Sequence, residues 1–116
     1  MKIALDYDCT LTAAPGLFTM FVRGAQADGH DIRIVTFRHP DNLKGGIGEA
    51  SQELKLPVIF TSHWQKMEHC KKIGWIPDIW IDDTPAHIPT IEDMLSRVDD
   101  IVEAEETEDD EWLNKK

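Results

Sequence analysis

The stretch Lys2-Ile3-Ala4-Leu5-Asp6-Tyr7-Asp8 leads from an apolar run directly into two carboxylates that lie one residue apart. Residues 3–5 are typical of a buried strand. Carboxylates resist desolvation, and two of them close together repel each other. The arrangement becomes favourable when a divalent cation lies between them, because its charge exceeds every other local charge. The stretch therefore predicts a hard metal ion near residue 6, and chemistry that uses it.

Short apolar runs alternate with amphipathic segments along the rest of the chain. We expect strands over residues 3–5, 31–36, 57–60 and 79–81, and helices over residues 14–28, 40–53, 63–73 and 89–98. Gly45, Gly46 and Gly48 weaken the helical pattern of residues 40–53. The alternation predicts an α/β fold, a three-layer α/β/α sandwich with a mostly parallel, Rossmann-like sheet.

Composition divides the chain into residues 1–98, the predicted α/β domain, and residues 99–116, an acidic C-terminal tail. The net charge is −10, and the tail contributes −7 through nine acidic residues and two lysines. This charge makes a nucleic-acid backbone an unlikely partner, although a nucleotide is compatible with it. The tail is expected to keep the protein in solution, with partner binding as the alternative.

Cysteine use and hydropathy bear on the compartment. Cys9 and Cys70 form no CxxC or zinc-binding pattern, which favours a reduced, cytoplasmic protein. The sequence contains no apolar run that resembles a secretion signal or a membrane span, so we expect no membrane partner. Trp64, Trp75 and Trp80 are expected to pack in the core or at a sheet edge.

Polar side chains follow three of the predicted strands. Asp6, Thr36 and the pair Asp82-Asp83 each stand where a strand ends. In parallel sheets the active crevice lies beyond the carboxyl ends of the strands, so we expect the two acidic pairs within about 10 Å of each other. Mg²⁺ prefers carboxylates, waters and phosphate oxygens. Together with the Thr36 hydroxyl and the Lys66 ammonium group, it would neutralise a phosphoryl group. The predicted metal-binding residues are Asp6, Asp8, Asp82 and Asp83.

The order of these motifs resembles that of the haloacid dehalogenase (HAD) superfamily. The resemblance covers roughly residues 1–90 and consists of Asp6-x-Asp8-x-Thr10, a strand ending in Thr36, then Lys66, and then Ile81-Asp82-Asp83. The sequence IDDTP at residues 81–85 resembles the capless carboxyl-terminal-domain phosphatase branch. The resemblance implies a Mg²⁺-dependent phosphohydrolase that cleaves phosphomonoesters through an aspartyl-phosphate intermediate.

The resemblance also implies roles for single residues. Asp6 would attack phosphorus. Asp8 would protonate the leaving oxygen, then deprotonate the hydrolytic water, while its backbone carbonyl faces Mg²⁺. Thr36 would hydrogen-bond the phosphoryl group and Lys66 would balance its charge, whereas Asp82 and Asp83 would hold the metal. The implied catalytic residues are thus Asp6, Asp8, Thr36 and Lys66.

Substrate contacts extend this set. The backbone N–H of Tyr7 is expected to face phosphate, and Arg38 follows Thr36 closely enough to contact substrate. The predicted substrate-binding residues are Tyr7, Thr36, Arg38 and Lys66. Lys66 is preferred over Lys71 and Lys72, which lie deeper in the predicted helix and nearer to Asp82 in sequence.

Two features distinguish the chain from many members of the superfamily that it resembles. Cys9 replaces the usual glycine after the second aspartate, so its side chain is expected to narrow the phosphate loop. Asp8 to Thr36 spans 28 positions and Thr36 to Lys66 spans 30, which leaves no room for a cap domain. An open site fits a large or protruding phosphate ester, or a site completed by a homo-oligomeric partner.

Other interpretations stay open at this point. Asp6 and Asp8 could be a turn and helix-cap pair. The domain could be a non-catalytic module that binds phosphate or protein. A phosphorylatable receiver domain also uses Asp, Thr and Lys on a parallel sheet, but receivers place the phospho-acceptor after a middle strand, whereas the DxD here follows the first.

Overall fold

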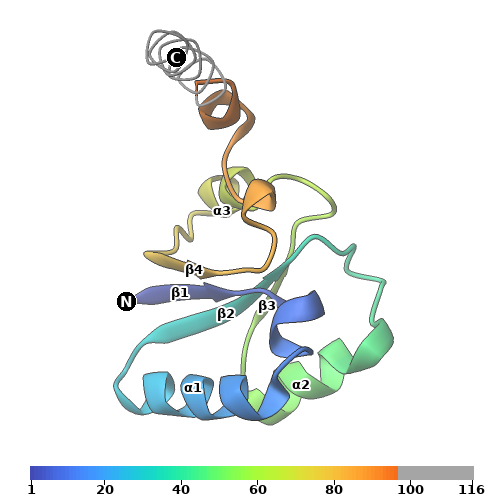
Figure 1. Ribbon diagram of the computed structural model, residues 1–116, viewed down its shortest axis with the longest axis vertical. Coiled ribbons are helices and arrows are strands. Elements are labelled where there is room, and N and C mark those ends of the chain that lie inside the picture. The colour runs from blue at the N-terminus through green and yellow to red at the C-terminus, as the bar shows by residue number, and fades with distance from the viewer. Residues whose placement is uncertain (97–116) are drawn as a thin grey trace, which may run out of the picture.

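A computed structural model describes residues 1–96 of the chain. The predicted acidic tail, and the end of the helix predicted over residues 89–98, lie outside the described residues. Four strands form one parallel sheet in the order β3-β2-β1-β4 (Figure 1). The strands are β1 (Lys2–Leu5), β2 (Asp31–Thr36), β3 (Val58–Phe60) and β4 (Ile79–Ile81). Their apolar, β-branched runs suit strands that are covered on both faces.

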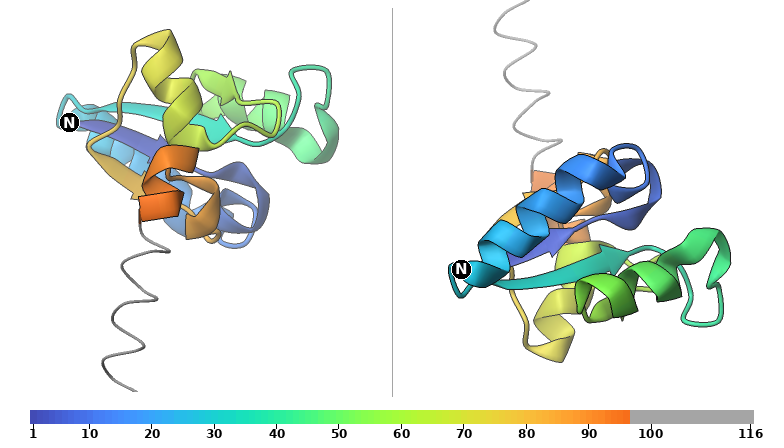
Figure 2. Two further views of the ribbon diagram at one scale, coloured as in Figure 1. Left: turned by 90° about the horizontal axis from the view of Figure 1, so that it is seen from above. Right: turned by 90° about the horizontal axis from the view of Figure 1, so that it is seen from below.

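Helices cover both faces of the sheet, which confirms the predicted three-layer α/β/α architecture (Figures 1 and 2). One face packs against α1 (Pro15–Ala27) and α2 (Ile47–Leu54), and the other against α3 (Lys66–Ile73). Successive residues of β1 serve opposite faces: Leu5 joins Val22 and Ile47 in one core cluster, and Ala4 joins Cys70 in the other. Within the described part of the chain, no cap domain is inserted between these elements.

Two helices begin three or more residues later than the sequence predicts. The segment predicted as a helix over residues 40–53 starts instead as the 3₁₀ turn η2 (Lys44–Gly46), and α2 begins only at Ile47. Gly45 and Gly46 have φ values of 72° and 81°, which a right-handed helix excludes. Ser62 and His63 likewise have positive φ values, 53° and 68°, so α3 begins at Lys66 rather than at residue 63.

The strand order places a topological switch beside β1. The chain leaves β1 through α1 toward β2 on one side, while β4 pairs with the other side of β1. Leu5 is level with Ile34 of β2 and with Ile81 of β4. The residues that follow β1 and β4 therefore meet at one edge, which is where open α/β sheets bind their ligands.

Short turns complete the described chain. The turn η1 (Tyr7–Leu11) follows β1, η3 (Pro85–His87) follows β4, and residues 91–96 are helical. None of the helices described has both the length and the apolar composition needed to cross a membrane.

Candidate metal and phosphate site

Carboxylates from the two ends of the described chain meet at the switch beside β1. Asp6 follows β1 and its backbone N–H donates to the Ile81 carbonyl, 2.9 Å away, at the end of β4. One carboxylate oxygen from each of Asp6, Asp82 and Asp83 lies within 4.8 Å of the other two. The predicted approach of the two acidic pairs is confirmed for these three side chains, although Asp6 and Asp82 are 76 positions apart in sequence.

Lys66 lies between two of the three carboxylates. Its Nζ is 2.8 Å from Oδ1 of Asp6 and 2.5 Å from Oδ2 of Asp82, and its side chain is only 2% exposed. Lys66 is the first residue of α3, so the end of the helix nearest the sheet edge delivers this ammonium group. Lys71 and Lys72, the alternatives that the sequence offered, are exposed.

Thr10 links the cluster from the opposite side. Its Oγ1 is 3.1 Å from Oδ2 of Asp6 and 3.1 Å from Oδ1 of Asp83, and it accepts the backbone N–H of Asp83 at 3.2 Å. One hydroxyl carries one proton, so Thr10 donates to one carboxylate at a time. Thr10 was not among the predicted site residues. The sequence does indicate a role for Thr10, because Thr10 is the last residue of the Asp6-x-Asp8-x-Thr10 motif.

The electrostatics of the cluster favour a cation. Burial raises the pKa of Asp6 to about 6, against the opposing effect of the Lys66 ammonium group. When ionised, the three carboxylates carry three negative charges, and Lys66 offsets one of them. The uncompensated charge and the oxygen donors fit Mg²⁺, which prefers such hard ligands. A cavity of about 270 Å³ beside the cluster is lined by Asp82 and Asp83, among others.

Asp8 does not join this cluster with its side chain. Its two carboxylate oxygens lie 2.7 and 2.9 Å from the Arg38 guanidinium, which forms a bidentate ion pair at the surface. Arg38 also donates to the backbone carbonyls of Asn42 and Lys44, at 3.2 and 2.5 Å. Asp8, predicted to be catalytic and to bind the metal, is therefore paired with Arg38, which was predicted to contact substrate. Together the two side chains hold the loop between β2 and α2.

Tyr7 and Thr36 also contact the loop between β2 and α2. The Tyr7 side chain is buried, its hydroxyl donates to the Gly45 carbonyl, and its ring centroid lies 5.4 Å from the Arg38 guanidinium carbon. Thr36 is 1% exposed at the end of β2, and its hydroxyl accepts the Arg38 backbone N–H at 3.3 Å. The side chain of Tyr7 thus anchors the loop, and the predicted contact of its backbone N–H with phosphate stays a prediction.

Cys9 lies at the bend of the turn that follows β1. Its φ of 61° lies in the left-handed region that favours glycine, the residue that the resemblance leads one to expect there. The Cys9 backbone N–H donates to Oγ1 of Thr12 at 2.9 Å, and the side chain is exposed. Cys9 also lines the cavity that Asp82 and Asp83 share. Cys9 is therefore part of the wall of the cavity beside the carboxylate cluster.

Comparison of the chain with protein-family models, curated proteins and solved structures finds no match.

Proposed function

We propose that the protein is a Mg²⁺-dependent phosphohydrolase that cleaves phosphomonoesters through an aspartyl-phosphate intermediate. The observation that carries the proposal is the meeting of Asp6 with Asp82 and Asp83 around Lys66, at the sheet edge where this class of fold binds ligands. The motif order that resembles the HAD superfamily gives each of these side chains a chemical role.

In the proposed reaction a carboxylate oxygen of Asp6 attacks phosphorus, and the bond from phosphorus to the leaving oxygen breaks. The leaving oxygen takes a proton, which the resemblance assigns to Asp8. The Asp8 carboxylate then takes a proton from water, whose oxygen attacks phosphorus. The bond from phosphorus to Asp6 breaks, and inorganic phosphate is released. Mg²⁺ held by Asp6, Asp82 and Asp83, and by the Asp8 carbonyl, would supply charge neutralisation at the phosphoryl oxygens.

The remaining residues position and balance the phosphoryl group. Lys66 already contacts Asp6, so its ammonium group is within reach of a phosphoryl oxygen bound to that carboxylate. The Thr36 hydroxyl accepts one hydrogen bond and keeps its own proton for a phosphoryl oxygen. Arg38 holds Asp8 in an ion pair, so Asp8 must exchange this partner before it can donate a proton to the leaving oxygen.

The second candidate function is a non-catalytic module that binds phosphate or protein on the same scaffold. Two observations favour it: the bidentate pairing of Asp8 with Arg38, and the presence of Cys9 in the wall of the cavity beside the cluster. As an enzyme or as a phosphate-binding module, the protein would take a partner with an exposed phosphate ester, because no cap domain encloses the edge within residues 1–96. A second copy of the chain is a further proposed partner.

Hydrolysis of an aryl phosphate by the full chain, with Mg²⁺ and with EDTA, tests the proposal. We expect turnover with Mg²⁺, none with EDTA, and none in Asp6→Asn. Asp28→Asn is the matched control, because Asp28 follows α1 at the opposite edge of the sheet and should leave turnover unchanged. No turnover of any ester in a panel, despite binding of Mg²⁺, would favour the non-catalytic module. Unchanged turnover in Asp6→Asn would refute the assigned nucleophile.

A further inference from the structure

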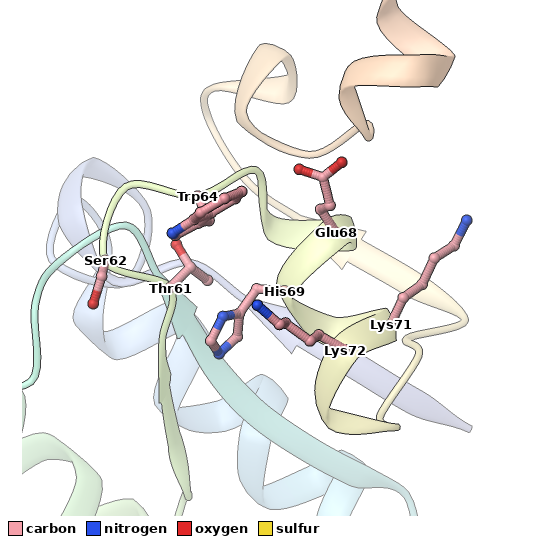
Figure 3. A pocket seen from close by; sticks show the side chains of 7 residues that line it. All are labelled: Thr61, Ser62, Trp64, Glu68, His69, Lys71 and Lys72. Carbon is pink, nitrogen blue, oxygen red and sulfur yellow. The ribbon is translucent and has the colours of Figure 1, made fainter.

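A second cavity, of about 720 Å³, lies on the α3 face of the sheet, where Figure 3 shows its lining side chains. Its lining includes Thr61, which follows β3, Trp64 of the loop between β3 and α3, and His69 and Lys72 of α3. It shares no lining residue with the cavity beside Asp82 and Asp83. The proposed catalytic chemistry therefore does not use this space.

One wall of the cavity contains the Thr61 hydroxyl, which is buried and lacks a hydrogen-bond partner within the described residues. Thr61 is 0% exposed, and its Oγ1 has no hydrogen-bond partner among the residues that the structure describes. Buried hydroxyls are almost always hydrogen-bonded, because leaving one unpaired is costly. The Thr61 side chain lies beneath Trp64, on the side where His69 and Lys72 extend (Figure 3). Because less than 1 Å² of this oxygen's surface is accessible, a polar atom of a ligand would reach it only where the Trp64 side chain moves aside (Figure 3).

The surrounding side chains define the chemistry of that ligand. Trp64 is 57% exposed, which leaves aromatic surface for a planar ring. The Nζ of Lys72 lies over the Trp64 ring, 5.6 Å from its centroid, so a cation already faces part of that surface and a planar ligand would share the ring with it. Aromatic rings that adjoin a lysine suit ligands that carry a flat base and an anionic group. A volume of about 720 Å³ is ample for a nucleotide-sized ligand.

The charged side chains that line the cavity indicate how a ligand would be oriented in it. Lys71 and Lys72 are neighbouring cations in a chain of net charge −10, so the local potential differs from that of the molecule. The one carboxylate in the lining, Glu68, points away from Thr61 and toward the segment of residues 85–96 (Figure 3). The anionic part of a ligand is thus expected near Lys72, and its uncharged part toward Glu68.

We propose that this cavity binds a nucleoside monophosphate, with its base against Trp64 and its phosphate at Lys72. Thr61 would hydrogen-bond a polar atom of the ligand, and His69 would offer a second polar contact from α3. The site is separate from the carboxylate cluster, so it does not depend on phosphohydrolase activity. A nucleotide bound here would act as an effector or as an anchor, not as the reacting ester.

Titration of the ¹⁵N-labelled full chain with AMP in EDTA tests the proposal. EDTA removes divalent cations, so the carboxylate cluster has no metal with which to attract phosphate. We expect chemical-shift changes at residues 61–72, with AMP binding at least tenfold more tightly than adenosine or inorganic phosphate. Absence of binding at millimolar AMP, or shift changes confined to residues 6–10 and 82–84, would overturn the proposal.

Variants separate specific binding from general charge attraction. Trp64→Ala and Lys72→Gln should each weaken AMP binding about tenfold, and both residues are exposed, so the fold should persist. Lys55→Gln is the control, because it removes the same charge from an exposed residue that follows α2, on the other face of the sheet, and does not line the cavity. Equal losses in Lys55→Gln and Lys72→Gln, or none in Trp64→Ala, would contradict the assigned pose. Phosphatase activity of Lys72→Gln on an aryl phosphate should be unchanged, which distinguishes this site from the catalytic one.

Discussion

Replacing Asp6 by asparagine is expected to stabilise the protein while it removes the proposed nucleophile. The pKa of Asp6 rises from 3.8 to about 6 on folding, chiefly because the carboxyl group is buried. One pKa unit corresponds to about 1.4 kcal/mol, so ionising Asp6 in the folded state costs up to about 3 kcal/mol at neutral pH. In Asp6→Asn, the amide oxygen still accepts from Lys66, and the amide N–H₂ can donate to Thr10. We therefore expect a gain of about 1–3 kcal/mol at pH 7.

The pH dependence of the folding stability shows whether the raised pKa of Asp6 causes this gain. Because the pKa is raised, the folded state binds more protons than the unfolded state between pH 3.8 and about 6. The contribution of Asp6 is fully present below pH 3.8 and is lost as the pH rises through about 6. In urea unfolding with EDTA, the free energy of unfolding of Asp6→Asn should exceed that of the unchanged protein by an amount that grows across this pH window. Above the window the difference should stay constant.

A neighbouring variant serves as the control for this measurement. Asp8→Asn removes one partner of an exposed ion pair, so it should lower stability by no more than about 1 kcal/mol. A loss of stability in Asp6→Asn at pH 7, or an advantage that does not change with pH, would refute the reasoning.

Three other predictions concern the turn after β1, the α3 face and the loop before α2. Cys9→Gly should raise stability by about 0.5–1 kcal/mol, because glycine adopts φ of 61° without the strain of a side chain; a lower urea midpoint would contradict this. Burial raises the pKa of the Cys70 thiol to about 11, so at pH 8 a disulfide reagent should modify Cys9 at once and Cys70 only after unfolding; two equally fast thiols would contradict it. Tyr7→Phe loses the hydrogen bond to the Gly45 carbonyl, so it should cost about 1 kcal/mol and speed proteolysis within residues 38–46; an unchanged cleavage rate would argue against an anchoring role.

The sheet and its polar edge could be predicted from the sequence because both rest on local patterns. β2 occupies residues 31–36 as predicted, since its β-branched run has one favourable conformation. Asp6 and Asp82 were expected at one edge because parallel strands place their carboxyl ends together. That inference needed only the strand order of an α/β fold, and no knowledge of side-chain contacts.

What the sequence missed depends on backbone conformation and on tertiary contacts. α3 starts late because Ser62 and His63 have positive φ values. Neither residue type indicates such a backbone conformation in the sequence. The pairing of Asp8 with Arg38 joins two loops, and no spacing rule predicts it. Trp64, expected in the core or at a sheet edge, is exposed, while Trp75 is buried as expected. Trp64 comes directly after His63, whose backbone has the left-handed conformation, so this loop and not a strand or helix sets the exposure of the Trp64 side chain.

Binding of Mn²⁺, as a paramagnetic substitute for Mg²⁺, tests most directly whether carboxylates from the two ends of the fold form one cation site. In ¹⁵N spectra of the full chain, we expect substoichiometric Mn²⁺ to broaden the amide signals of residues 6–10 and 82–84 together. Asp83→Asn should weaken this effect at both segments in parallel, whereas Asp28→Asn should not. Broadening confined to residues 99–116, where nine acidic side chains occur, or broadening of only one of the two segments, would contradict a shared site.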